Sequence, residues 1–361
     1  MTRFCALLLA VGCFIAVPGT TQAAPRPNPK LIKKVTLKWE DQPVVEGIVK
    51  EIEAIGMKVS VDTAAIEEEG LEGAKDTLEL TSVPLYPALQ QIARLHSLYI
   101  INNGTDLKVV PRTQADEEYV EVTYSLQGLQ GAVTDEEEFN TALRAACDFW
   151  QESGDGKGEY AVLPAARVVI SQTHPMHEEL AKTFSMAELA LRGRTPNYLD
   201  PRTQLTLRKE FQFASDEISL EEQFQNLLGG VNFLFDRASI ADEEIHLSAK
   251  SAPPSGSDTV INQLAALCAA SNLEWSVRDG LLVIESAEAA KWDVEVRVYN
   301  VRKHITPDLT PFLMAAKLTN TPELGGWLEQ GTGEAVCAPL GPLLVVRHNR
   351  AGHEKIAELV K

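Results

Sequence analysis

The stretch RVVISQTHPMHEELA (167–181) decides how this chain is organised, because a related stretch, LLVVRHNRAGHEKIA, occupies residues 343–357. Both begin with an apolar run, pass through a polar residue and end with apolar residues at helical spacing. Each carries one histidine at the same place, His177 and His353. This pattern predicts a buried strand followed at once by an amphipathic helix.

Two further matches keep nearly the same register along the chain. KVSVDTAAI (58–66) matches NFLFDRASI (232–240), and VEVTYSL (120–126) matches VEVRVYN (294–300). A repeat that holds its register over such distances predicts that the chain was built by tandem duplication. The polar stretch 192–204, which contains two prolines, is interpreted as the linker between the copies.

The first part of each copy predicts a β-α-β-β-α-β-β module, over residues 35–111 and 205–286. Apolar residues at helical spacing alternate with short strands in both stretches. The dipeptides Asn103-Gly104 and Asp279-Gly280 each predict a closing hairpin, because both turn residues must adopt positive φ. Ser219 with Glu222 three residues later predicts a capped helix start.

The second part of each copy predicts a β-α-β-β-α module, over residues 119–191 and 292–361. Thr134 with Glu137 predicts a capping box at the first helix. In the second copy, the apolar residues Leu309, Leu313 and Ala316 are expected along the matching helix. The fold class is therefore α+β, with four small modules in tandem.

The modules resemble domains of a known family. VTLKWEDQPVVEGIVKEI, VPLYPALQQIARLHSLYIINNGTDLKVV and the matching stretch 211–284 resemble the short domain at the N-terminus of secretins and TonB-dependent receptors, the STN domain. LVVRHNRAGHEKIAELV and its partner in the first copy resemble the KH-like domain that follows in secretins. The resemblance implies periplasmic domains without catalytic residues, which dock proteins or stack into rings. We expect no secretin or receptor barrel after Lys361, so a pore or transport role is not expected.

Residues 1–23 are interpreted as a secretory signal peptide. Arg3 precedes the apolar run CALLLAVGCFIAV, and small residues follow it. We expect cleavage after Ala23, although AVGC ending at Cys13 loosely resembles a lipoprotein box and leaves lipidation as an alternative. The rest of the chain contains no apolar stretch long enough to span a bilayer. An exported protein, periplasmic or extracellular, without a transmembrane segment after processing is predicted.

The composition excludes some partners. Fifty-one acidic residues against 33 basic ones give a formal net charge of −18. Such a charge opposes binding to nucleic acid or to anionic lipid, both of which need clustered cations. Three cysteines follow the signal peptide, Cys147, Cys268 and Cys337. They lack metal-binding spacing and are expected to be buried thiols, although whether two of them pair is left open.

One cluster suggests chemistry, namely His174, His177 and Glu178. Two histidines three residues apart beside a glutamate could supply metal ligands for a hydrolase. The second copy argues against this interpretation, because Arg350 stands where His174 would be. Polar caps, a proline in the first turn and early glutamates are also ordinary features of a helix start. We therefore expect no catalytic, cofactor-binding or metal-binding residues, and no cofactor.

Three functional hypotheses follow from the sequence. The preferred one is a secreted, non-enzymatic bacterial envelope protein that acts through protein–protein contacts. The second is a homo-oligomeric ring or scaffold component of a secretion-type system. The third is a metal-dependent hydrolase that uses His174, His177 and Glu178.

Overall fold

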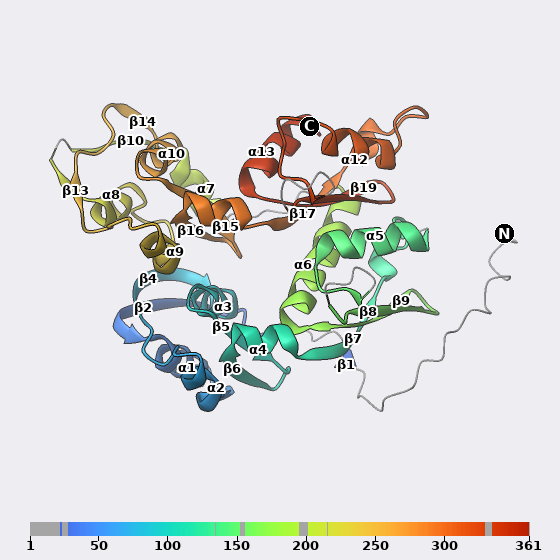
Figure 1. Ribbon diagram of the computed structural model, residues 1–361, viewed down its shortest axis with the longest axis horizontal. Helices are drawn as coiled ribbons and strands as arrows, with labels where there is room; N and C mark the ends of the chain where they lie inside the picture. Colours follow the sequence, from blue (N-terminus) through green and yellow to red (C-terminus); the bar gives the residue numbers. More distant parts are fainter. Residues whose placement is uncertain are drawn as a thin grey trace, which may run out of the picture.

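The computed structural model describes residues 22–23, 28–133, 135–151, 156–194, 201–214, 216–328 and 334–360. Most of the expected signal peptide, Cys13, the middle of the expected linker and parts of both glycine-rich loops lie outside these residues. We name the four modules A1 (35–111), B1 (119–191), A2 (205–286) and B2 (292–361). Figure 1 shows that like modules are neighbours, with A1 beside A2 and B1 beside B2.

Module A1 has two small sheets around a helical core. Its elements are β2 (Lys34–Pro43), α1 (Val44–Ala54), β3 (Lys58–Val61), α2 (Thr63–Glu68), β4 (Lys75–Pro84), α3 (Leu85–Leu95), β5 (Leu98–Asn102) and β6 (Asp106–Pro111). Strands β2 and β4 form an antiparallel pair, while β6 lies between parallel β3 and antiparallel β5. The helix α1 buries Val44, Ile48 and Ile52, which recur at helical spacing. The short helix α2 is an addition to the predicted order.

Module A2 repeats this arrangement with interrupted strands. Its elements are β10 (Glu210–Gln212), β11 (Ile218–Ser219), α8 (Leu220–Leu227), β12 (Phe233–Phe235), α9 (Arg237–Asp242), β13 (Lys250–Ser251), β14 (Ser257–Thr259), α10 (Val260–Ala270), β15 (Leu273–Arg278) and β16 (Leu281–Ser286). The pairs β10-β14 and β11-β13 replace the single long pair of A1. Pro253 and Pro254 lie in the break between β13 and β14, where prolines cannot donate to a strand ladder.

Local turn and cap predictions are confirmed in A2 and modified elsewhere. Ser219 and Glu222 form the expected capping box. Asp279 and Gly280 both have positive φ in a two-residue hairpin loop. The loop at Gly104 has three residues instead, and Gly104 alone supplies the positive φ there. Asp279 therefore lies at the tip of the tight hairpin between β15 and β16.

Modules B1 and B2 have the expected β-α-β-β-α order. B1 contains β7 (Tyr119–Ser125), η1 (Gln127–Leu129), α5 (Glu136–Ala146), β8 (Glu159–Leu163), β9 (Arg167–Thr173) and α6 (His174–Leu191). B2 contains β17 (Glu295–Asn300), η3 (Arg302–His304), α12 (Pro311–Thr319), β18 (Val336–Leu340), β19 (Leu343–His348) and α13 (Arg350–Leu359). In each module the third strand lies between the other two, and all pairs within this set are antiparallel.

Short elements join the modules. Helix α4 (Arg112–Glu117) follows A1, α11 (Ala287–Trp292) follows A2, and α7 (Pro201–Leu207) begins within the expected linker. Strand β1 (Gln22–Ala23), at the end of the expected signal peptide, pairs in parallel with Val122 and Thr123 of β7. Within the described ranges, the helices are all too short or too polar to cross a membrane.

Two details of the B modules differ from the sequence prediction. Helix α5 is capped by Asp135, whose side chain accepts from the backbone N–H of Glu138, so the expected Thr134–Glu137 box is wrong by one residue. Helix α12 buries Met314, Ala315 and Leu318. The expected stripe is therefore on the wrong side of the helix, since Leu313 is exposed and Leu309 precedes the helix.

The two B modules share one hydrophobic core. The outer face of the B2 sheet, including Val298, Leu340 and Val345, packs in one cluster with Phe139 and Phe184 of B1. Strand β18 contacts α5, and β17 contacts α6. In Figure 1 the B2 sheet lies between the helices of B1 and its own helices α12 and α13. The result is a stack of alternating sheet and helix layers, which buries apolar surface between modules as a single domain would.

The two A modules also contact each other. Leu234 and Leu281 of A2 belong to the core cluster of A1. The Asn232 side chain donates to the carbonyl of Thr81 at 2.9 Å and accepts from the Thr81 N–H at 2.6 Å. An amide side chain thus completes both backbone hydrogen bonds of one residue in β4.

Candidate functional site

His177, the histidine shared by both sequence repeats, is a structural group. It lies in the first turn of α6, is 8% exposed, and its Nε2 is 2.8 Å from the carbonyl oxygen of Val120 on β7. Its Nδ1 is 2.9 Å from the hydroxyl of Tyr124. Nε2 must carry the proton, because a carbonyl only accepts, and Nδ1 then accepts from the Tyr124 O–H. Burial lowers the pKa of His177 to about 4, so the ring is neutral at pH 7.

His353 makes the same contacts in B2. Its Nε2 is 2.8 Å from the carbonyl oxygen of Glu295, and its Nδ1 is 2.9 Å from the hydroxyl of Tyr299. Burial lowers its pKa to about 3. Each histidine therefore binds the strand that neighbours its helix. The pairs also show that Tyr124 corresponds to Tyr299, so the predicted match of VEVTYSL with VEVRVYN is shifted by one residue.

The other two members of the suspected metal cluster point elsewhere. Nε2 of His174 is 3.6 Å from a carboxylate oxygen of Glu118. Glu178 points toward A1, where its Oε2 accepts from Arg94 at 3.0 Å and from the Tyr99 hydroxyl at 2.8 Å. Across the residues that the structure describes, no group of three or more metal-binding side chains converges. The three candidate residues therefore serve three separate contacts.

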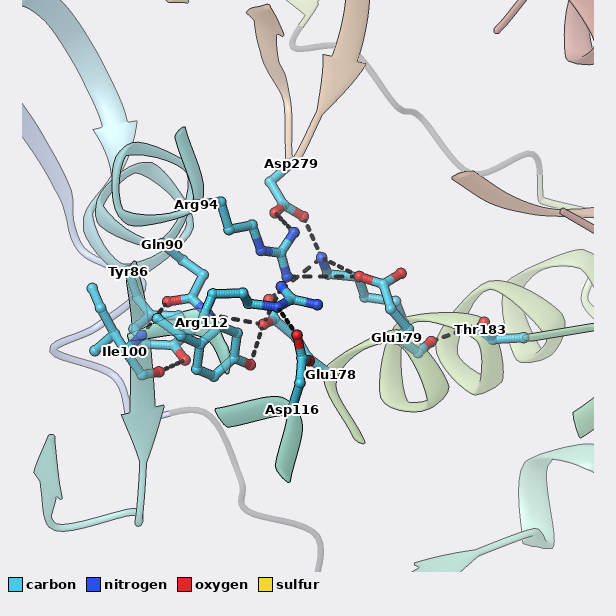
Figure 2. A network of polar contacts seen from close by, with 12 residues as sticks. Tyr86, Gln90, Arg94, Ile100, Arg112, Asp116, Glu178, Glu179, Thr183 and Asp279 are labelled. Carbon is cyan, nitrogen blue, oxygen red and sulfur yellow. Dashed lines mark hydrogen bonds and ion pairs between the residues drawn. The ribbon is translucent and has the colours of Figure 1, made fainter. Parts of the chain in front are cut away.

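A cluster of charged residues joins three modules at Glu178 (Figure 2). Arg94 of α3 in A1 lies 3.7 Å from Glu179 of α6 and 3.8 Å from Asp279, the tip of the A2 hairpin. Lys182, one turn along α6, is 2.8 Å from Asp279 and 3.4 Å from Glu178. We call these five residues the junction cluster. It contains three carboxylates and two cations, so each cation bridges carboxylates from different modules.

The electrostatics of the junction cluster favour its charged form. Burial alone would raise the pKa of Glu178, but Arg94 and Lys182 outweigh it and lower the pKa to about 2. The pKa of Lys182 is raised, because the surrounding carboxylates outweigh its burial. Burial and the charge of Glu178 raise the pKa of Tyr99, which keeps its hydroxyl protonated as a donor. Glu178, Lys182 and the Tyr99 hydroxyl are thus each fixed in one protonation state at neutral pH.

A cleft of about 1160 Å³ adjoins the junction cluster between the modules. Besides Arg94, three arginines line it, namely Arg202, Arg278 and Arg350. Arg278 contacts Glu285 and Asp293, each at 2.5 Å. Arg350 is 2.6 Å from Glu274 and lies over the ring of Trp275, 4.3 Å from its centroid. Arg278 and Arg350 therefore join A2 to B2 and are not available as an anion-binding pair.

A second candidate site is an apolar surface on B2. Among the described residues, ten large apolar side chains are well exposed, and six of them lie in B2: Trp292, Ile305, Phe312, Leu313, Leu328 and Leu359. Phe312 and Leu313 are 68% and 47% exposed in the first turn of α12. Ile305 directly follows η3, which is tied to the end of α13 by a 3.2 Å contact between His304 and the carbonyl of Val360. Adjacent exposed apolar side chains such as Phe312 and Leu313 are typical of interaction surfaces.

Comparisons with known proteins give similarity to solved structures only. No family model and no curated protein matches the chain. "Structure of XcpQN012" is 13% identical, covers 65% of this chain and 96% of that chain, and has a TM-score of 0.18. The N-terminal domain of the secretin XcpQ from Pseudomonas aeruginosa is 12% identical, with coverages of 91% and 97% and a TM-score of 0.17. The PulD, PulS and PulC HR domain complex of Klebsiella pneumoniae is 12% identical, with coverages of 90% and 50% and a TM-score of 0.22. Identities and TM-scores in this range carry no functional inference by themselves.

Sequence reasoning found some members of these sites and missed others. The sequence predicts Asp279 in a hairpin turn and offers Glu178 as a candidate metal ligand, but it does not predict that the two belong to one cluster. Arg94 was missed, because a lone basic residue near the end of an amphipathic helix resembles many exposed ones. Leu313 was assigned to the core.

Proposed function

We propose that this chain is an exported, non-enzymatic envelope protein that acts by binding other proteins through tandem STN-like and KH-like modules. The observation that carries the proposal is the apolar surface of B2, which holds most of the well-exposed large apolar side chains among the described residues. An exposed apolar surface on a chain with a formal charge of −18 favours a protein partner over an anionic membrane.

The polar residues support the same proposal. His177 and His353 each bind a neighbouring strand, and Glu178 binds Arg94 and Tyr99. The two histidines hold a helix to a strand within B1 and within B2, and Glu178 holds A1 to B1. A fixed arrangement of modules suits a scaffold, because preorganised surfaces lose less entropy on binding.

A test uses the tagged full-length chain in its native host. We expect to find the chain in the exported fraction, with the mass that cleavage after Ala23 would leave. In intact cells it should cross-link to a discrete envelope protein. The complex should re-form from the two purified proteins, as measured by calorimetry. The intact mass distinguishes cleavage after Ala23 from lipidation at Cys13.

Other outcomes would contradict the proposal. A chain that remains in the cytoplasm would remove the export part. A purified chain that forms only closed homo-oligomers in light scattering, and binds no other protein, would favour the ring alternative. Stoichiometric zinc that is lost in a His177→Ala variant, together with hydrolytic activity, would favour the hydrolase alternative.

A further inference from the structure

Module A1 begins with a short basic segment in a chain that is otherwise strongly acidic. Residues 29–39 contain no acidic residue, and they include four exposed lysines, Lys30, Lys33, Lys34 and Lys38. Ile32, which lies among them, is 55% exposed. Because Lys38 pairs with Glu79 at 3.6 Å, we call only the residues ahead of it, 30–34, the lysine segment.

The lysine segment is fixed to the body of A1. The side chain of Leu31 is 2% exposed and belongs to the core cluster of A1. The carbonyl of Leu31 accepts from the N–H of Tyr86 at 2.9 Å, and the carbonyl of Lys33 accepts from the N–H of Leu85 at 3.1 Å. These two N–H groups belong to the first turn of α3, so the segment covers the start of that helix. A surface held in this way loses little entropy on binding.

The positive charge of the lysine segment is not neutralised by the described parts of the chain. None of the carboxylates that the structure describes forms an ion pair with Lys33 or Lys34. The ammonium group of Lys30 donates to the carbonyl of Gly56 at 3.1 Å, which is a neutral acceptor. Helix α3 has no acidic residue in its first turn, so the positive end of its dipole adds to the potential there.

We propose that the lysine segment binds an acidic segment of the envelope partner, in which carboxylates flank an apolar side chain. This inference rests on the proposed function, and it names one contact surface and the chemistry of the partner. The carboxylates would pair with Lys33 and Lys34, while the apolar side chain would pack on Ile32. Opposite charges across such a contact speed the encounter and select the partner.

A second copy of this chain does not offer the required segment. Among the described residues, runs of three or more acidic side chains occupy 67–69, 116–118, 135–138 and 242–244. The large apolar or aromatic residues beside these runs are buried or half-buried in their own modules: Ile66, Tyr119, Phe139 and Ile245. They are therefore not free to pack on Ile32. Two chains that each carry a formal charge of −18 also repel one another.

An anionic bilayer fits the lysine segment less well than a peptide does. A bilayer is a wide plane, so it would also approach the acidic side chains exposed on the same module, such as Glu40, Glu46 and Glu53. A peptide can contact the lysine segment alone, and charges farther away than about 10 Å are largely screened at physiological salt. The observations therefore favour a protein segment over lipid.

The first experiment places the photo-cross-linker p-benzoylphenylalanine at position 32 of the full-length chain in its native host. The control places it at Leu205, which is similarly exposed, at 66%, but lies on α7 of A2. We expect one major adduct from position 32, at least about tenfold stronger than from position 205. Mass spectrometry should place the adduct in a peptide of an envelope protein that has carboxylates on both sides of an apolar residue.

The second experiment titrates the purified full-length chain into a labelled synthetic copy of that cross-linked peptide and follows fluorescence anisotropy. Replacing Lys33→Glu and Lys34→Glu together should weaken binding at least about tenfold. The matched control, Lys209→Glu with Lys250→Glu, makes the same change in net charge at two exposed lysines of A2, and it should change the affinity less than about twofold. A peptide with its glutamates changed to lysines should bind the Lys33→Glu, Lys34→Glu variant better than it binds the unmodified chain.

Several results would overturn the inference. These are an adduct with lipid or with a second copy of this chain, equal adducts from positions 32 and 205, and a cross-linked peptide without carboxylates. Equal losses of affinity in the two double variants would also overturn it, once urea unfolding has shown that both are folded. Lys33→Gln with Lys34→Gln provides the same test if the glutamate variant does not fold. If the envelope partner cross-links elsewhere on the chain but not at position 32, this inference fails and the proposed function survives.

Discussion

Replacing Arg94 with Met should loosen the attachment of A1 to B1 and A2 by a measurable amount. The side chains of Arg94 and Glu178 are 20% and 19% exposed, so solvent screens their 3.0 Å contact only partly. The pKa of Glu178 falls from 4.5 to about 2, which corresponds to about 3 kcal/mol in favour of the ionised form. Removing one partner of a buried ion pair costs about 3–5 kcal/mol, because the remaining charge is left uncompensated. We therefore expect Arg94→Met to lower the free energy of unfolding by about 3 kcal/mol at pH 7.

The assay is a double-mutant cycle with Arg94→Met and Glu178→Gln, measured by urea unfolding. The expected coupling energy is about 2–3 kcal/mol at pH 7, above the unfolded pKa of Glu178, where its stabilising effect is complete. The matched control is Arg192→Met, since Arg192 pairs with Glu188 at 3.5 Å but is 64% exposed. It should cost less than about 0.5 kcal/mol. A coupling energy for Arg94 and Glu178 no larger than this control would refute the reasoning.

Tryptophan fluorescence suits this measurement, because each module contains one buried tryptophan. These are Trp39 in A1, Trp150 in B1, Trp275 in A2 and Trp327 in B2. If the junction cluster couples the modules, the unmodified chain should unfold in a single transition. The Arg94→Met variant should show A1 unfolding at lower urea, which a variant that retains only Trp39 would report.

Three further predictions concern stability. The free energy of unfolding should fall by about 3 kcal/mol between pH 6.5 and pH 4 because of His177 alone. Over this range the histidine ring gains a proton in the unfolded chain but stays neutral in the folded one. In urea titrations, the free energy of unfolding of a His177→Gln variant should therefore depend less steeply on pH. His353 acts in the same direction over a wider range, to about pH 3. Gly341→Ala should destabilise the B1–B2 contact more than Gly70→Ala destabilises A1. Both glycines have positive φ, but only at Gly341 would an added Cβ meet other backbone, that of Ala132 at 2.6 Å. Equal shifts in melting temperature for the two variants would contradict this. The three buried thiols should react with a thiol reagent only at the rate of unfolding, and fast labelling of the folded chain would contradict their burial.

Local patterns in the sequence predicted the elements well. The order of strands and helices in the B modules, the Ser219 cap and the Asp279-Gly280 hairpin all depend on residues close together in the chain. Such features are encoded by periodicity and by the few residue types that caps and turns accept. The Asp135 cap was misplaced by one residue because Thr134 and Asp135 are adjacent and both are good caps.

Features that depend on distant contacts were not predictable in the same way. Helix α12 begins with a continuous apolar run, 312–316, so its periodicity there has no unique phase and the burial of Leu313 could not be decided from the sequence. The contact between Arg94 and Glu178 joins residues 84 positions apart in the sequence. A salt bridge between modules leaves no local pattern, because either residue alone looks like an ordinary exposed charge.

The stacking of B2 on B1 also has a consequence for stoichiometry. It joins a sheet face of one unit to a helix face of the next, which makes it a heterologous contact, and such contacts extend into rings or filaments when every unit offers both faces. In this chain Glu121 and Arg167 are exposed on the sheet face of the first unit, and Lys317 is exposed on the helix face of the last unit. Stacking would bury these charges, so the contact that joins B1 to B2 should not repeat from one chain to the next.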